Sequence, residues 1–250
     1  MRPPTGLELV LTDRVTLADL ATLVAAVMAV SAGTLPSWAQ SRPMKISFIG
    51  SGRQGGALGI LFAKAGHQVF FSSRHPEELK ELVAKAGPNA RAGLPQEAAT
   101  FGDVVVIAVP YGVTPQVGKD YAALMKGKIV IDLGNPREDR DGPMATDAKA
   151  RGTGVATAGY IPGVKLVRAF NALSFVQVER ESHRAGEKLG IPVAGDDAGA
   201  VKTVVQLVND AGFEPVVTGN LSTAKLFDTG TAVYVKGMTA KQIKDTLKLP

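Results

Sequence analysis

Short apolar runs alternate with helical patterns along the chain from Met44 onward. Runs with the length and composition of strands occupy residues 45–49, 66–73, 103–110, 128–136, 165–171, 191–195 and 213–219. Amphipathic helices are predicted over residues 57–65 and 75–87, and a further helix is expected to begin at Asp196-Asp197. Strands that alternate with helices of this length predict an α/β fold with a doubly wound parallel sheet and right-handed crossovers. We expect residues 44–250 to form a single domain.

The composition is that of an ordinary globular protein. The chain has 250 residues, of which 45% are hydrophobic and 20% charged. Its net charge of +5 would suit an anionic ligand, although a mildly basic solvated surface is the interpretation we favour. Lys and Arg do not cluster with aromatic residues, so we expect no nucleic-acid partner.

Cysteine is missing from the sequence, which excludes disulfides, thiolate nucleophiles and thiolate metal sites. The three histidines, His67, His75 and His183, lie far apart and lack the spacing of metal ligands. We therefore predict no metal site.

The first 43 residues differ from the rest of the chain. Residues 17–35 are apolar apart from Asp19 and a few small hydroxyl residues, and Arg14 precedes them. Ser37 and Ala39 are small residues placed as in a signal peptide cleaved after Ala39. This layout is typical of a secretory signal peptide, so we keep residues 1–43 apart from the folded domain.

Two other interpretations of residues 1–43 stay open. A retained membrane anchor fits poorly with Asp19 and with the cleavage-like exit. Translation could instead start at Met44, directly before the first strand, and the upstream segment would then not be native. The signal-like interpretation, which we favour, predicts an exported protein without a membrane anchor after cleavage. A start at Met44 predicts a cytoplasmic one.

A glycine-rich turn follows the first strand and leads into a helix. Within FIGSGRQGGALG (residues 48–59), Gly50, Gly52 and Gly55 satisfy the spacing G-x-G-x-x-G. The first glycine of such a loop permits a tight turn, the second admits a pyrophosphate against the backbone, and the third allows close helix–strand packing. Free N–H groups at the start of the helix then face the phosphate charge. We predict a dinucleotide site in a Rossmann-type domain; the alternative is a packing turn without a ligand.

The end of the second strand indicates which dinucleotide is bound. NAD sites usually carry an acidic residue there, which accepts hydrogen bonds from the ribose. This chain has Ser72, Ser73, Arg74 and His75 instead. Hydroxyl and guanidinium donors suit a 2′-phosphate, which an acidic residue would repel, so we predict NADP(H) over NAD(H). The alternative for Ser73 and Arg74 is a helix N-cap with a solvated neighbour.

Ligands of such sheets lie across the carboxyl ends of the strands. The strand-end residues expected along the path from adenine to nicotinamide are Val109, Pro110 and Tyr111, Asn135 and Pro136, and Phe170 and Asn171. Asn135 and Asn171 could equally be turn residues that end their strands.

Several longer stretches occur together in one order. They are MKISFIGSGRQGGALG, SSRHPEEL, DVVVIAVPYG, KIVIDLGNP, VRAFNALS and VAGDDAGAVKTVVQLVNDAGFEPVVTGNLSTAKLFD. In this combination the chain resembles the NADPH-dependent reductases of the deazaflavin coenzyme F420. The same fold forms the NADPH-oxidising domain of the six-transmembrane epithelial antigen metalloreductases. The resemblance extends from Met44 to about Asp228.

This resemblance implies a domain that binds NADPH and passes hydride to a deazaflavin (F420) or flavin (FAD or FMN) ring. The residues it assigns to the pyrophosphate and ribose are Gly50, Ser51, Gly52, Arg53 and Gln54. It assigns Ser73 and Arg74 to the 2′-phosphate, and Pro110, Asn135 and Asn171 to the border of the nicotinamide. The tail after Asp228 does not match the family closely enough to place the second cofactor. The signal-like segment is likewise foreign to a cytoplasmic reductase, and no twin-arginine pair precedes it.

No catalytic side chain is predicted. Hydride transfer between stacked rings relies on the cofactors for its chemistry, and the sequence contains no convincing acid–base pair. Two other functions stay open: an NADP-dependent dehydrogenase of a small carbonyl or imine substrate, and a non-catalytic NADP-binding module. The first would append a large helical domain, whereas the residues after Asn171 have a strand–helix–strand pattern.

A short helix is expected after Thr239, with Ile243 and Leu247 four residues apart. The two side chains could form a homodimer contact or pack on the domain itself.

Overall fold

A computed structural model of the protein describes residues 42–250, which cluster as one unit. The predicted signal-like segment, the cleavage after Ala39 and the alternative membrane anchor lie outside the described residues, apart from the last residues before Met44. Among residues 42–250, none of the helices has the length and apolar character needed to cross a membrane.

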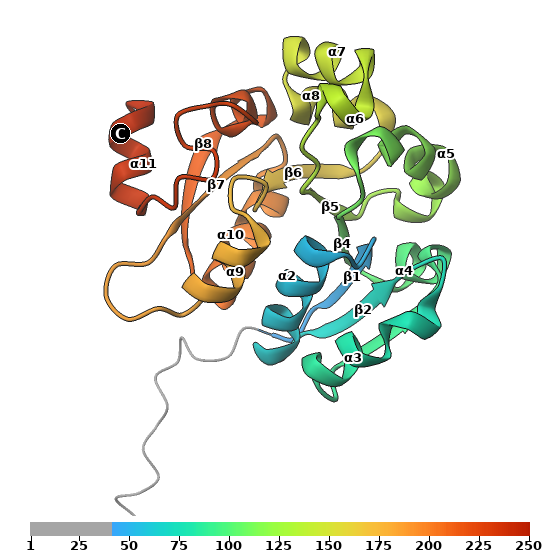
Figure 1. The fold of residues 1–250 in the computed structure, drawn as a ribbon. Coiled ribbons are helices and arrows are strands. Elements are labelled where there is room, and N and C mark those ends of the chain that lie inside the picture. Colours follow the sequence, from blue (N-terminus) through green and yellow to red (C-terminus); the bar gives the residue numbers. More distant parts are fainter. Residues whose placement is uncertain (1–41) are drawn as a thin grey trace, which may run out of the picture. The chain divides into compact units, whose positions relative to one another are not determined.

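One eight-stranded sheet runs through the domain in the order β3-β2-β1-β4-β5-β6-β7-β8 (Figure 1). The strands are β1 (Lys45–Ile49), β2 (Gln68–Ser72), β3 (Ala90–Gly93), β4 (Val104–Ile107), β5 (Ile129–Asp132), β6 (Lys165–Ala169), β7 (Gly190–Gly195) and β8 (Glu214–Gly219). The strand order reverses direction between β1 and β4, so the carboxyl ends of these two strands border the crevice in which such sheets bind ligands. The predicted doubly wound α/β fold of Rossmann type is confirmed.

One strand pair departs from the predicted parallel sheet. β6 and β7 are antiparallel, with Val167 opposite Gly195, whereas every other neighbouring pair of described strands is parallel. The connection from β6 to β7 is not a crossover, because the chain re-enters the sheet at the same end of the strands at which it left. Consequently β7 ends beside the beginning of β6, where Lys165 Nζ lies 3.2 Å from Asp197 Oδ2.

Helices cover both faces of the sheet. They are α2 (Arg53–Lys64), α3 (Lys80–Ala86), α4 (Pro95–Phe101), α5 (Thr114–Met125), α6 (Glu138–Asp141), α7 (Pro143–Arg151), α8 (Thr153–Tyr160), α9 (Phe175–Glu181), α10 (Ala198–Asp210) and α11 (Ala240–Leu247), with short 3₁₀ segments η1 (Pro76–Leu79), η2 (Tyr111–Val113) and η3 (Leu221–Phe227). Buried residues of α2 and α10 share the largest apolar core with the strands, and those of α4 and α5 line a second core on the other face, against which partly buried residues of α8 pack.

The helix after the glycine turn begins earlier than predicted. α2 begins at Arg53 rather than residue 57, because Gly56 N donates to Gly52 O at 2.7 Å and closes the first turn there. Gly59 brings this helix onto the sheet, since a Cβ atom at this position would lie 2.2 Å from the Phe71 ring. The helix predicted over 75–87 likewise opens as η1 before continuing as α3.

The tail after Asp228 folds back on the domain. The predicted terminal helix is present as α11, and Ile243 is buried against the start of β7, in an apolar cluster with Val216 and Phe227. Val235 N donates to Ala172 O at 2.8 Å and holds the tail against the loop after β6. Ile243 therefore packs within its own domain; the homodimer stays a prediction.

Candidate functional site

The glycine loop and the end of β4 are in close contact. Gly50 has φ +91°, and a Cβ atom there would lie 2.8 Å from both Ala108 O and Val109 Cγ1. A Cβ atom on Gly55 would lie 2.6 Å from Gly50 O. These two glycines are therefore required by the turn itself. Gly55 also packs closely beside the end of β4, where its added Cβ would lie 3.0 Å from Ala108 Cβ, and Gly59 extends the close packing of α2 along the sheet.

Gly52 differs from both of these glycines. Its backbone is extended, with φ −71°, and no atom of the described chain lies within 4 Å of the position of an added Cβ. It caps α2 without any side-chain hydrogen bond, and the first turn contains no acidic residue. The helix start therefore has open space beside Gly52 and no side-chain cap for its N–H groups, an arrangement that fits an anionic group such as a pyrophosphate.

Ser51 ties the loop to the second strand. Its Oγ accepts a hydrogen bond from Ser72 N at 2.9 Å, and the buried Ser72 hydroxyl donates to Phe48 O at 2.6 Å. The Ser72 hydroxyl hydrogen is therefore used within the protein interior and cannot bind a ligand. Only its neighbour Ser73 can present a hydroxyl at the end of β2.

Ser73 and Arg74, which were predicted from the sequence to hold a 2′-phosphate, directly follow the end of β2. Ser73 Oγ accepts from His75 N at 3.0 Å in a local turn and does not cap a helix, because η1 is capped by His75 without a side-chain hydrogen bond. The Ser73 O–H stays available as a donor. Arg74 is exposed and makes no ion pair with any residue of 42–250. His75 is paired with Glu77 at 3.4 Å instead.

Gln54 fastens the start of α2 to the loop after β6. Its Nε2 donates to Phe170 O at 3.2 Å and to Leu173 O at 3.1 Å, so both amide hydrogens are used within the protein. Phe170 has φ +60°, a conformation that costs free energy for a bulky residue and persists only where its surroundings hold it. The Arg53 guanidinium lies 5.4 Å from the centre of the Phe175 ring. Both residues of α2 thus contact the loop that borders the crevice.

A cavity of about 320 Å³ opens at the carboxyl ends of β4, β5 and β6. Its lining residues are Gln54, Ala108, Val109, Pro110, Leu133, Asn135, Arg137, Arg140, Leu173, Ser174, Phe175 and Tyr234. Four residues predicted from the sequence are among them: Gln54, Val109, Pro110 and Asn135. Pro136 and Asn171 are buried and do not line the cavity. Ser73 and Arg74 also lie outside it, as expected for the opposite end of a dinucleotide.

Sequence reasoning missed the other lining residues. Arg137 and Arg140 directly follow the predicted strand end at Pro136, and their position there could have indicated them. Tyr234 comes from the tail, and nothing in the surrounding sequence indicates that its side chain reaches the crevice.

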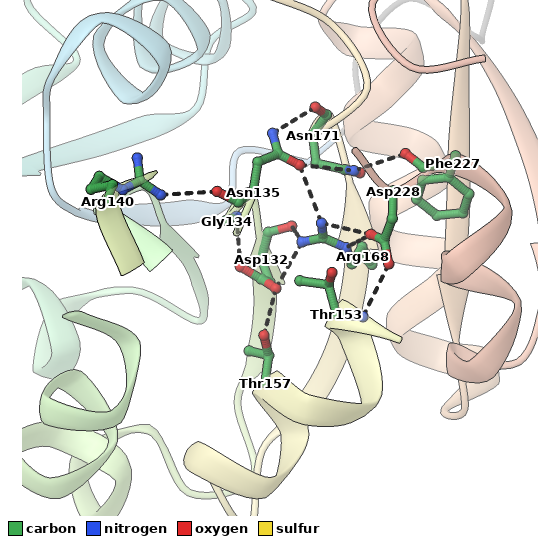
Figure 2. Close-up of polar contacts among 10 residues, drawn as sticks. All are labelled: Asp132, Gly134, Asn135, Arg140, Thr153, Thr157, Arg168, Asn171, Phe227 and Asp228. Carbon is green, nitrogen blue, oxygen red and sulfur yellow. Dashed lines mark hydrogen bonds and ion pairs between the residues drawn. The ribbon is translucent and has the colours of Figure 1, made fainter. Parts of the chain in front are cut away.

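A buried ionic cluster lies next to this cavity (Figure 2). Arg168 of β6 is fully buried between two carboxylates, with Nη1 2.9 Å from Asp132 Oδ2 and Nη2 2.8 Å from Asp228 Oδ1. The Asp132 carboxylate also accepts from Gly134 N at 2.7 Å and Thr157 Oγ1 at 2.9 Å. The cluster joins β5, β6, α8 and the end of η3 beneath the crevice.

Burial raises the pKa of Asp132 above its ordinary value, against the opposing effects of Arg168, Gly134 and Thr157. Each hydrogen-bonding partner of this side chain is a donor, an arrangement that suits the carboxylate form. Burial likewise raises the pKa of Tyr111, which lies against Gly134 with its hydroxyl buried. We therefore treat Tyr111 as a neutral phenol.

Comparison with known proteins places this geometry in a family. Residues 45–136 match the family model described as NADP oxidoreductase, coenzyme F420-dependent. An F420-dependent NADP reductase from Methanocaldococcus jannaschii is 28% identical over 77% of this chain and 91% of its own. The metalloreductase STEAP3 from Rattus norvegicus is 26% identical over 78% of this chain, but only 38% of its own length is covered.

A solved structure supports the fold. The crystal structure of a hypothetical protein from Sinorhizobium meliloti superposes with a TM-score of 0.66, at 24% identity, and covers 80% of this chain and 97% of that one. At this identity the likeness concerns the fold alone. Together, the matched model, the related reductases and the glycine loop at the β1–β4 junction relate this chain to the coenzyme F420-dependent NADP oxidoreductase family, which its residues 45–136 match directly.

Proposed function

We propose that this NADP-dependent oxidoreductase transfers hydride between NADPH and a flat ring acceptor of the deazaflavin or flavin type. The observation that carries the proposal is that the start of α2 and a cavity lie next to each other at the carboxyl ends of the strands. The open, uncapped start of α2 at Gly52 adjoins a cavity bordered by residues that follow β4, β5 and β6. A dinucleotide that extends from the first to the second would reach the cavity with its nicotinamide end.

The end of the crevice proposed to bind the nucleotide, at Ser73 and Arg74, favours NADPH over NADH. Arg74 is exposed and without an ion-pair partner among residues 42–250, and the Ser73 hydroxyl beside it can still donate. Neither residue carries negative charge. A 2′-phosphate would therefore meet donors at this position and no repelling carboxylate.

The acceptor end combines aromatic and cationic side chains. Phe175 and Tyr234 line the cavity together with Arg137 and Arg140. Aromatic faces suit a planar heterocycle, and the two guanidinium groups suit an acceptor with anionic substituents. The name of the Methanocaldococcus relative supports F420 as the redox partner of NADP(H), and the likeness to the metalloreductase STEAP3 is a reason to test other acceptors as well.

The residues of this chain contribute position rather than acid–base chemistry. When bound, a dihydronicotinamide supplies the hydride. Gly52 and the N–H groups of α2 would fix the pyrophosphate, and Val109, Pro110 and Leu133 would form apolar walls that exclude water from the reacting rings. The rate then depends on holding donor and acceptor atoms at reacting distance.

The proposal is tested by anaerobic NADPH oxidation with the full chain. F420, FMN and FAD are offered separately as acceptors, with NADH as the control donor and Gly52→Ala as the control protein. Oxidation with one acceptor, preferring NADPH and lost in Gly52→Ala, is the expected result and names the acceptor. NADPH binding without oxidation by any of the three would overturn the proposal and leave a carbonyl substrate or a non-catalytic module.

A further inference from the structure

Asn135 is the only asparagine among the cavity-lining residues. Its amide oxygen Oδ1 lies 3.4 Å from Arg168 Nη2 and 3.5 Å from Asn171 Nδ2. Its Nδ2 donates to Asn171 O at 2.9 Å, and its backbone carbonyl accepts from Arg140 Nη2 at 2.9 Å. Figure 2 shows the side chain between these partners. Arg168 of β6 and Asn171 just after it therefore hold the side-chain amide, while Arg140 of α6 holds the backbone of the same residue.

Arg168 decides which edge of that amide is the donor. A guanidinium has five N–H groups and no acceptor, so the group that faces it must be an oxygen. Rotating the amide by half a turn would set its NH₂ against the guanidinium and its oxygen against Asn171 O, which would give two repulsive pairings. Consequently Nδ2 is fixed on the side away from Arg168. One of its two hydrogens bonds Asn171 O, and the other has no partner among residues 42–250.

Arg168 itself cannot turn away from Asn135. Its Nε and Nη2 are held by Asp228 Oδ1 at 3.0 and 2.8 Å, and its Nη1 by Asp132 Oδ2 at 2.9 Å. Asp228 is fixed in turn, because its Oδ2 accepts from Thr153 N at 3.0 Å. The guanidinium plane is thus set from both sides by carboxylates.

We propose that Arg168 is a positioning residue that fixes the Asn135 amide so that a donor N–H, not an acceptor, is presented to the crevice. The inference rests on the proposed function, in which this crevice holds the nicotinamide. A donor at this wall suits a carbonyl oxygen, such as that of the nicotinamide carboxamide, and would hold the ring in one of its two orientations. Arg168 touches neither cofactor nor substrate and acts through Asn135.

A double-mutant cycle on NADPH oxidation tests this dependence. Arg168→Lys keeps the charge but loses the planar fork, and Asn135→Ala removes the amide. Each is expected to lower kcat about tenfold through a misplaced ring. The double variant is expected to be no slower than Asn135→Ala alone when the acceptor is saturating, because a shift of the tail and Tyr234 through Asp228 would then raise the acceptor KM and not lower kcat. Multiplied effects, about a hundredfold, would overturn the proposal. Val204→Ala, buried in α10, is the control for lost stability and should leave kcat unchanged.

A second readout needs no turnover. The side-chain amide signals of Asn135 in ¹⁵N-labelled full-length protein are assigned by their loss in Asn135→Ala. They are expected to shift in Arg168→Lys and to exchange with solvent at least tenfold faster. Should that variant not fold, Asp228→Asn releases the guanidinium from one side and is expected to give a smaller change of the same kind. Unchanged Asn135 signals would overturn the proposal. Failure of the wild type to oxidise NADPH with any acceptor would overturn the proposed function instead, and the amide signals would still decide the role of Arg168.

Discussion

Arg168 and Asp228 lie sixty residues apart, and two nitrogens of the Arg168 guanidinium bind the same carboxylate oxygen of Asp228. Nε and Nη2 of Arg168 lie 3.0 and 2.8 Å from Oδ1 of Asp228, while Oδ2 accepts from Thr153 N at 3.0 Å. Asp228 ends η3 and begins the tail that carries Tyr234 into the cavity. This pair thus connects the terminal part of the chain with the centre of the sheet.

Replacing Arg168 by methionine is expected to destabilise the fold strongly. Two buried carboxylates, Asp132 and Asp228, would lose the cation between them, and breaking a buried pair costs about 3–5 kcal/mol. Urea unfolding followed by circular dichroism measures the loss. Arg151→Met is the matched control, because Arg151 pairs with Asp147 on the surface and such a pair contributes no more than about 1 kcal/mol. Equal effects of the two substitutions would contradict the assigned role of the cluster.

Alanine at Gly50 and at Gly52 should have opposite consequences. Gly50→Ala forces a side chain into the left-handed region and against Ala108 O, so we expect a loss of about 2 kcal/mol or more in stability. Gly52→Ala meets no atom of the described chain and should change stability by less than about 1 kcal/mol. Its methyl group would instead occupy the space where a pyrophosphate approaches the backbone, and we expect NADPH binding to weaken at least about tenfold.

Thermal unfolding and NADPH titration of both variants distinguish these effects. A Gly52→Ala protein that is stable and binds NADPH as tightly as the wild type would show that the loop does not hold the pyrophosphate.

Arg74 is expected to select NADPH over NADH. A hydrogen bond to a charged group is worth about 1.5–3 kcal/mol, so Arg74→Ala should weaken NADPH binding about 10- to 100-fold and leave NADH binding unchanged. Fluorescence titration with both nucleotides measures the two affinities. Lys80→Ala removes a nearby positive charge from α3 and should affect neither nucleotide strongly. Parallel weakening for NADPH and NADH would argue against a contact with the 2′-phosphate.

The parts of the fold that could be predicted are those with a local pattern. β4 could be predicted within the run 103–110, because a strand that is buried on both faces is continuously apolar. The glycine loop could be predicted because the six residues 50–55 contain all three glycines of its motif. β3 was missed, since Ala90–Gly93 is an edge strand without an apolar run. The antiparallel direction of β7 leaves no trace in the sequence, because an apolar run reads alike in either direction.

The candidate site divides in the same way. Gly52 and Arg74 could be named as candidates from the sequence because the ligand proposed for them follows a single βαβ unit; their roles stay predictions. Arg168 could not, since a charged residue inside a strand pattern becomes meaningful only when Asp132 and Asp228 are brought to it. Tyr234 depends on the tail folding back through Val235 N and Ala172 O.

Tyr234 is expected to affect the acceptor and not the donor. It lines the cavity beside Arg137, away from Ser73 and Arg74. Loss of an aromatic contact with a planar ring costs about 0.5–1.5 kcal/mol, so Tyr234→Ala should raise KM for the acceptor about two- to tenfold with an unchanged Kd for NADPH. Steady-state kinetics and NADPH titration measure these constants. Tyr234→Phe keeps the ring and should behave as the wild type. A changed NADPH affinity alone would place Tyr234 at the donor end instead.

His67 is expected to make the fold sensitive to mild acid. Burial lowers the pKa of its imidazole below the ordinary value of 6.5, an effect larger than the opposing attraction of Asp210. Met44 N donates to Nδ1 at 3.2 Å, so the neutral ring carries its hydrogen on Nε2, 3.1 Å from Asp210 Oδ2. The unfolded chain takes up a proton near pH 6.5 and the folded chain only at lower pH. The stabilisation is therefore complete above 6.5 and is lost as the pH falls below it.

Urea unfolding of wild type and His67→Gln at intervals from about pH 7.5 to about pH 5 isolates this effect, because Asp132, whose pKa is raised, and Asp141 and Asp197, whose pKa values are lowered, contribute alike to both proteins. Glutamine can replace both hydrogen bonds of His67 without titrating, so His67→Gln should flatten the fall in unfolding free energy over this range. His75→Gln is the control, since that histidine is exposed and should leave the slope unchanged. Identical slopes for wild type and His67→Gln would show that the proton taken up on unfolding belongs to another group.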